Sequence, residues 1–92
     1  MQHTMDQATF SSQLKQEGFQ ELTTVTRAPN GFVDTHTHPF EAKALILASE
    51  ILIQVQGGDA LYQPGQVFHL PSGMPHTERY GPQGVTYLVG RK

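Results

Sequence analysis

The stretch of sequence that decides the fold is GQVFHLPSGMPH, residues 65–76, and it is preceded in the chain by HTHPFE at residues 36–41. Two histidines of the shorter stretch, His36 and His38, stand two residues apart, so on an extended segment their side chains project from the same face. A third histidine on a later strand, His76, can close a pocket around one cation. The two stretches together predict a metal site built on β-strands.

Short extended runs separated by turn residues occupy most of the chain around these stretches. Turn signals occur at Pro29-Asn30-Gly31, at Gly57-Gly58 and at Pro64-Gly65, where the last pair suits the centre of a type II turn. Many short strands spaced by turns favour an antiparallel sandwich or barrel. The predicted strands are residues 19–27, 32–38, 44–48, 51–55, 60–63, 66–70, 76–80 and 85–89.

One helical pattern precedes the strands, over residues 6–17. Asp6 can cap its first turn, and Gly18 can end it in the left-handed conformation. We therefore expect two parts, an N-terminal segment with a short helix at residues 1–18 and a β-barrel at residues 19–92.

Composition excludes several classes of function. The 92 residues carry eight acidic and six basic side chains, a formal net charge of -2, and no basic run that would follow a phosphate backbone, so nucleic acid is not an expected partner. The absence of cysteine excludes disulfides, thiolate metal sites and a cysteine nucleophile. No apolar run is long enough to cross a membrane and no leader pattern begins the chain, so we expect a cytoplasmic protein without a membrane partner.

The spacing of the longer stretch resembles the second motif of the cupin superfamily, G-x5-P-x-G-x2-H-x3-N. Gly65, Pro71, Gly73 and His76 occupy the motif positions, and Tyr80 stands where the family usually has Asn. The resemblance covers residues 31–89 and implies an all-β fold, the antiparallel jelly-roll β-barrel of the cupins, here with a short N-terminal helix. It also implies a metal held by the three histidines.

The first cupin motif, G-x5-H-x-H-x3,4-E-x6-G, is matched in part. His36 and His38 are present, but Ala42 and Lys43 occupy the usual Glu positions and Glu41 comes one residue early. A bulge at Pro39-Phe40 would turn Glu41 toward the metal, so we name Glu41 as a candidate metal ligand together with the three histidines. The alternative is a surface carboxylate paired with Lys43.

Glu78 follows His76 by two residues and shares its face on a regular strand. We name it as a candidate catalytic base, and it also suits a fourth metal ligand or an acceptor for an imidazole N–H. The alternative is a solvated glutamate at the end of a strand near the barrel mouth.

These features predict a protein that binds one divalent transition metal, Mn, Fe, Ni, Co or Zn, and binds or acts on a small oxygen-containing molecule. The resemblance implies dioxygenase, isomerase or decarboxylase chemistry if the protein is an enzyme, and it leaves that question open. The alternative is a non-catalytic binding or sensing module in which the metal is structural. The polar edge strand at residues 19–27 and the resemblance favour a homodimer.

Overall fold

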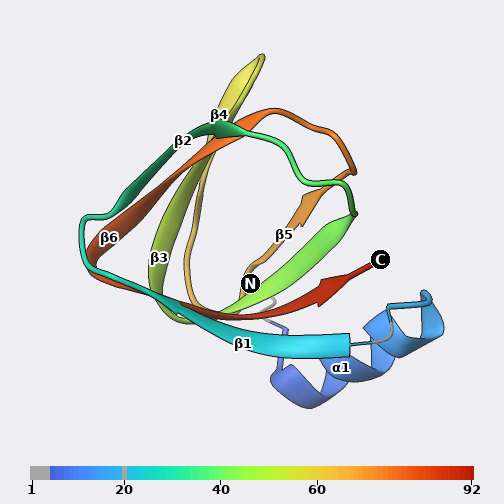
Figure 1. Ribbon diagram of the computed structural model, residues 1–92. Helices are drawn as coiled ribbons and strands as arrows, with labels where there is room; N and C mark the ends of the chain where they lie inside the picture. The colour runs from blue at the N-terminus through green and yellow to red at the C-terminus, as the bar shows by residue number, and fades with distance from the viewer. Residues whose placement is uncertain (1–4, 20) are drawn as a thin grey trace.

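The structure is a computed structural model that describes residues 5–19 and 21–92 (Figure 1). Residues 1–4 and 20, which belong to the predicted N-terminal segment and first strand, lie outside the described residues. The described chain forms helix α1 (Gln7–Gln16) and strands β1 (Glu21–Arg27), β2 (Phe32–His36), β3 (Ala42–Val55), β4 (Gly58–Tyr62), β5 (Val67–Leu70) and β6 (His76–Arg91).

Helix α1 begins and ends where the sequence predicts. The Asp6 carboxylate accepts a hydrogen bond from the Thr9 backbone N–H at 2.7 Å, and Gly18 follows the helix with φ of 95°. The helix buries Phe10 and Leu14 against Leu45 of the sheet. The helix therefore covers the outer face of the sheet where β3 and β6 carry Leu45 and Leu88. No helix in the described ranges is long and apolar enough to cross a membrane.

Two long strands, β3 and β6, form the centre of the sheet. The predicted division of each into two shorter strands is wrong. The sequence predicts two strands in each region, broken at Ser49-Glu50 and at residues 81–84, but the structure continues one strand through each. The antiparallel register passes from Ser49 opposite Val85 to Ile51 opposite Tyr80, so residues 81–84 form an extra loop within β6. Both strands bend there, and Ser49 adopts φ of 64°.

The bends divide the sheet into two layers that face each other (Figure 1). The first half of β3 pairs with β5 and with the second half of β6, which also pairs with β1. The second half of β3 pairs with β4 and with the first half of β6, which also pairs with β2. This antiparallel arrangement is the predicted all-β architecture.

Alternation along the central strands separates two cores. Tyr87 and Val89 point between the layers, while Leu88 between them packs on the helix side. The core between the layers contains Ala42, Ala44, Ile46, Ile51, Ile53, Phe68, Leu70, Tyr80, Val85, Tyr87 and Val89. Because side chains from both layers point inward, the polar residues of the motifs meet inside the barrel.

Candidate metal site

A bulge in β2 turns His36 into the barrel. Val33 lies opposite Glu78 in β6, and His36 lies opposite His76, so β2 has three residue steps where β6 has two. In a regular strand His36 would point away from the face that Val33 occupies, and the extra residue reverses that direction. The structure thus has its bulge between Val33 and His36, while Pro39 and Phe40 lie in the connection between β2 and β3.

His38 and His76 are held by a contact between the two motif loops. The Gly73 backbone N–H donates to the His38 carbonyl at 2.8 Å, and Gly73 has φ of 78°, a conformation that favours glycine. His76 begins β6 directly after this loop and is only 2% exposed. Gly73 of the second motif therefore joins the loop before His76 to the segment that carries His38.

Four side chains converge at this point of the barrel: His36, His38, His76 and Glu78. Each offers one ligand atom, and these four atoms all lie within 4.8 Å of one another. The His36 and His76 rings are 4.2 Å apart between centroids. The structure brings together the three predicted histidines and the predicted glutamate of β6.

The hydrogen-bond partners of two imidazoles show which nitrogen is free. His36 Nδ1 lies 2.8 Å from the Asp34 carbonyl oxygen, and His76 Nδ1 lies 3.0 Å from the Met74 carbonyl oxygen. A carbonyl oxygen can only accept, so each Nδ1 carries the hydrogen and each neutral ring presents a bare lone pair at Nε2. Both rings are therefore held in the tautomer that suits a metal ligand.

Those two lone pairs face a third acceptor. The Nε2 atoms of His36 and His76 each lie 3.1 Å from Oε2 of Glu78, which is 9% exposed. Acceptors at this separation need a cation between them, either a proton on each ring or one metal ion. Ligands about 2.1 Å from a tetrahedral ion are about 3.4 Å apart, so these separations fit a metal site that is slightly contracted.

His38 adds an unsatisfied nitrogen to the same group. Its Nδ1 atom is buried and has no hydrogen-bond partner among the described residues. Burial lowers the pKa of His38, and positive charge on His76 or His36 would lower it further. The ring is thus kept neutral, the form that binds a metal. These observations show that the donor set fits a divalent transition metal.

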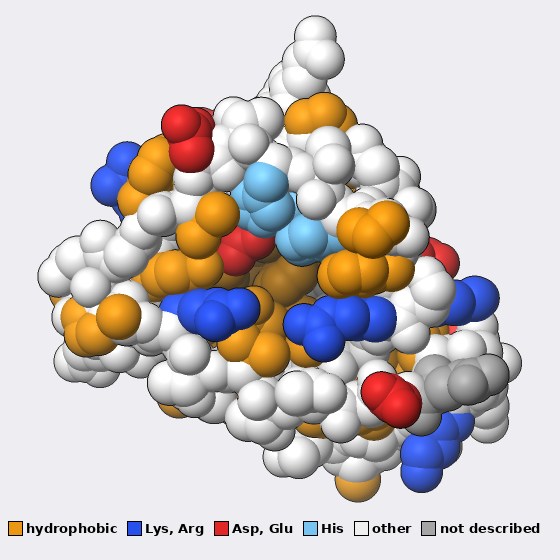
Figure 2. Space-filling model, viewed as in Figure 1, with side chains coloured by type: hydrophobic (Ala, Val, Ile, Leu, Met, Phe, Trp, Pro, Cys, Tyr) orange, Lys and Arg blue, Asp and Glu red, His pale blue; other side chains and the backbone are white. Residues whose placement is uncertain are grey.

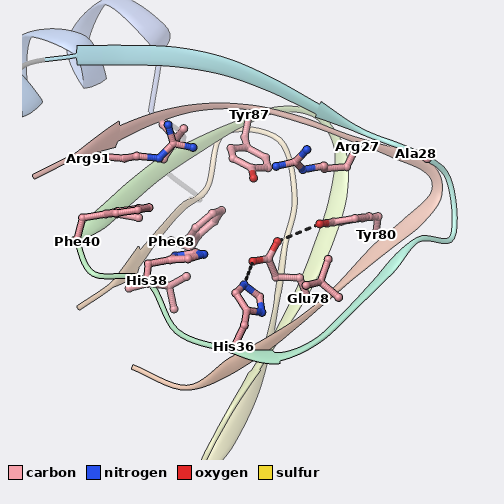
Figure 3. A pocket seen from close by; sticks show the side chains of 14 residues that line it. Arg27, Ala28, His36, His38, Phe40, Phe68, Glu78, Tyr80, Tyr87 and Arg91 are labelled. Atoms are coloured by element: carbon pink, nitrogen blue, oxygen red, sulfur yellow. Dashed lines mark hydrogen bonds and ion pairs between the residues drawn. The ribbon is translucent and has the colours of Figure 1, made fainter. Parts of the chain in front are cut away.

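Tyr80 holds the other oxygen of the Glu78 carboxylate. Its hydroxyl donates to Oε1 at 3.1 Å, as the dashed line in Figure 3 shows. Burial, and then the negative charge of Glu78, raise the pKa of Tyr80, so the phenol remains a donor. Tyr80, at the usual Asn position of the motif, fixes the orientation of Glu78.

Glu41 is not brought into this group. Its carboxylate is paired with the imidazole of His69 on β5, and both side chains are partly exposed. Lys43, the alternative partner considered for Glu41, binds Glu17 at 3.0 Å. The carboxylate that lies beside the histidines is that of Glu78, and the expected bulge that would turn Glu41 inward is absent from residues 39–40.

Three of these side chains, His36, His38 and Glu78, form one wall of a cavity of about 510 Å³ that opens to the surface. Figure 2 shows histidine and acidic side chains within this hollow and basic side chains along its opposite rim. The close view identifies the opposite wall as Arg27, Tyr87 and Arg91 (Figure 3). Sequence reasoning missed the two arginines because they lie outside the motifs, although Arg91 shares a face with Tyr87 by alternation along β6.

Comparison with solved structures identifies the fold. The chain is similar to the DMSP lyase DddQ from Ruegeria pomeroyi (28% identity, TM-score 0.69, 77% of this chain and 36% of that one). It is also similar to a cupin-2 domain protein from Shewanella frigidimarina (16%, 0.59, 74% and 63%) and to KdgF from a Halomonas species (14%, 0.63, 76% and 66%). The chain spans less than two thirds of the length of each of these proteins.

No protein-family model and no curated protein matches the chain. The structural neighbours are nevertheless cupin-fold proteins, and the described chain is mostly antiparallel β-sheet with one short helix. The chain therefore has the cupin fold that its two motifs predict.

Proposed function

We propose that the protein binds one divalent transition metal through His36, His38, His76 and Glu78 and uses this centre to bind a small oxygen-containing molecule. The observation that carries the proposal is that two imidazole acceptors, the Nε2 atoms of His36 and His76, each lie 3.1 Å from a third acceptor, Oε2 of Glu78. Glu41 has no part in this proposal, since its carboxylate pairs with His69.

Each residue has a separate task in the proposed site. The Asp34 and Met74 carbonyls hold the His36 and His76 rings with Nε2 toward the centre. Tyr80 holds Glu78, and the position of the Glu78 oxygen beside both imidazoles favours the role of a ligand over that of a free base. When bound, the metal supplies a Lewis acid that polarises a coordinated oxygen.

The cavity favours a ligand-binding centre over a purely structural one. His36, His38 and Glu78 line an open space of about 510 Å³, within the usual range for small-molecule sites. Similar structures include DMSP lyases and a polyketide cyclase, which fits a role in small-molecule chemistry. Cytoplasmic location and a homodimer stay predictions.

Metal binding is tested by calorimetry and elemental analysis on chelator-treated protein. We expect one equivalent of a first-row divalent ion, and His76→Ala should weaken its affinity more than about 100-fold, because losing a ligand costs more than losing an outer partner. His69→Ala is the matched control, since His69 lies outside the group. Failure of the wild-type protein to bind any such ion refutes the proposal.

A second measurement distinguishes a ligand-binding metal centre from a purely structural one. A ligand-binding centre predicts that small oxygen ligands such as acetohydroxamate perturb the visible spectrum of cobalt-substituted protein, because they enter its coordination. A structural site is closed to such ligands. An unchanged spectrum, with metal binding that only raises the melting temperature, would favour the non-catalytic module.

A further inference from the structure

Two arginines from different strands stand on the wall opposite the metal ligands (Figure 3). Arg91 lies near the end of β6 and shares the inward face with Tyr87 and Val89. Arg27 is the last residue of β1 and lies opposite Val85, another inward residue, so it too belongs to the inner face. Both guanidinium groups therefore border the same cavity.

These arginines have no acidic partner in the part of the chain that the structure describes. Within residues 5–19 and 21–92, neither guanidinium pairs with a carboxylate. They are two of the six basic residues of a chain with net charge -2. Among the residues that the structure describes, Glu78 is the single acidic one that lines the cavity, and its oxygens are already engaged by His36, His76 and Tyr80. The cavity mouth thus carries uncompensated positive charge.

Apolar groups lie beside and below this charge. The guanidinium carbon of Arg91 lies 5.4 Å from the centroid of the Phe40 ring, and Phe68, Leu70 and Val89 line the space beneath. Burial raises the pKa of Tyr87, which keeps its hydroxyl available as a donor between the arginines. The walls suit a carbon skeleton, and the rim suits an anionic group.

We propose that the ligand of this cavity is a small organic carboxylate, bound with its carboxylate at Arg27 and Arg91 and its carbon skeleton against Phe40 and Phe68. This inference rests on the proposed function, because the other end of such a ligand lies toward the metal centre. Guanidinium groups match planar carboxylates through paired hydrogen bonds. Removing water from a singly charged carboxylate beside apolar walls also costs less free energy than removing it from a phosphate dianion.

The test compares butanoate with its neutral counterpart butanamide by NMR titration, on chelator-treated and on metal-loaded protein. We expect butanoate to bind about tenfold or more tightly than butanamide in both forms, the size of effect given by charged hydrogen bonds. Arg27→Gln and Arg91→Gln should each weaken butanoate binding by a similar factor. Arg27→Lys and Arg91→Lys should recover part of it, because the charge remains without the paired geometry.

Arg79→Gln is the matched control, since it removes the same charge from the outer face of β6, where Arg79 lies over the Phe32 ring. Equal binding of butanoate and butanamide, or an equal loss in Arg79→Gln, overturns the inference. Butanoate binding that disappears with the metal but survives both arginine substitutions also overturns it, because the carboxylate then binds the metal. If inorganic phosphate binds more tightly than butanoate, and its binding depends on the arginines, the site is a phosphate site and the inference is wrong.

Metal content gives a separate readout. Arg27→Gln and Arg91→Gln should retain the wild-type equivalent of metal, because both arginines lie outside the ligand group. Wild-type protein that holds metal but does not prefer butanoate refutes this inference alone. Wild-type protein without metal refutes the proposed function, while the butanoate titration of the metal-free form still decides the arginine site.

Discussion

Glu78 offers its two carboxylate oxygens to different partners. Oε2 lies beside two imidazole nitrogens, and Oε1 accepts the Tyr80 hydrogen bond. A carboxylate divided in this way is held in one orientation, with its negative charge beside the lone pairs of His36 and His76. A metal ion would offset the mutual repulsion of these acceptors.

Glu78→Gln should lower metal affinity by at least the roughly 10- to 100-fold that the loss of an outer partner costs, because the amide keeps the size of the side chain and loses the charge of a proposed ligand. The measurement is calorimetric titration of chelator-treated protein with zinc or cobalt. Glu41→Gln, the matched control, should leave the affinity unchanged, since Glu41 pairs with His69. If Glu41→Gln had the larger effect, Glu41 would be the fourth ligand.

The lowered pKa of His38 predicts a pH dependence of the metal-free protein. The unfolded chain binds a proton at His38 near its ordinary pKa of 6.5, whereas the folded protein binds it only at lower pH. The free energy of unfolding should therefore fall as pH falls through 6.5, down to the folded pKa. Chemical denaturation from pH 7.5 to 5.5 measures this dependence.

His38→Gln should make the fall of stability with decreasing pH shallower, since it removes one of the groups that produce it. His69→Gln is the control, because it leaves His38 in place and should retain the His38 contribution. An identical pH dependence in the wild type and His38→Gln would contradict the depressed pKa.

Much of the site follows from residue spacing. The second motif predicts His76, and alternation by two predicts that Glu78 shares its face. The position of Glu41 could not be predicted, because it depends on where a bulge occurs, and a bulge moved by a few residues changes which side chain points inward. The arginines of the opposite wall come from β1 and the end of β6, which no local pattern connects.

At the scale of the strands, the bends in β3 and β6 decide how the two layers meet. Residues such as Gly81 and Gly84 are turn formers, and the sequence predicts two separate strands where the structure has a bend within one strand. Glycine and proline are common both in turns between strands and in bends within a strand, because the backbone leaves the regular strand conformation in both. Strand existence was therefore predictable, and strand continuity was not.

Gly84→Ala should destabilise the protein by more than the cost of a strained conformation alone, about 1 to 3 kcal/mol, because the added Cβ also meets the backbone. Gly84 has φ of 80°, and an added Cβ would lie 2.3 Å from the Arg27 carbonyl oxygen. Thermal or chemical denaturation measures the change. Gly57→Ala is the control, with φ of 95° and nothing within 4 Å of the added Cβ. An equal loss in both variants would show that the close contact has no effect.

At the scale of the whole molecule, the sheet separates a core that surrounds the cavity from a core under α1. Phe10, Leu14 and Phe19 pack on Leu45 and Leu88 on the outer side, away from the proposed metal ligands. Stability and metal binding should therefore respond separately to substitutions on the two sides.

Leu14→Ala should cost about 2 to 5 kcal/mol of unfolding free energy, because Leu14 is fully buried and its loss leaves a cavity. Denaturation measures the loss, and Gln13→Ala on the exposed side of the helix should have little effect. The metal affinity of folded Leu14→Ala should equal that of the wild type. A weakened affinity would show that the helix supports the metal site through the sheet.

β6 begins with His76 and Glu78 and ends at Arg91, so a single strand carries groups on both walls of the cavity. Residues 81–84 join the two halves of this strand at its bend. We expect an insertion or deletion in this segment to change the angle between the halves, and with it the distance between the two walls and the length of ligand that fits between them.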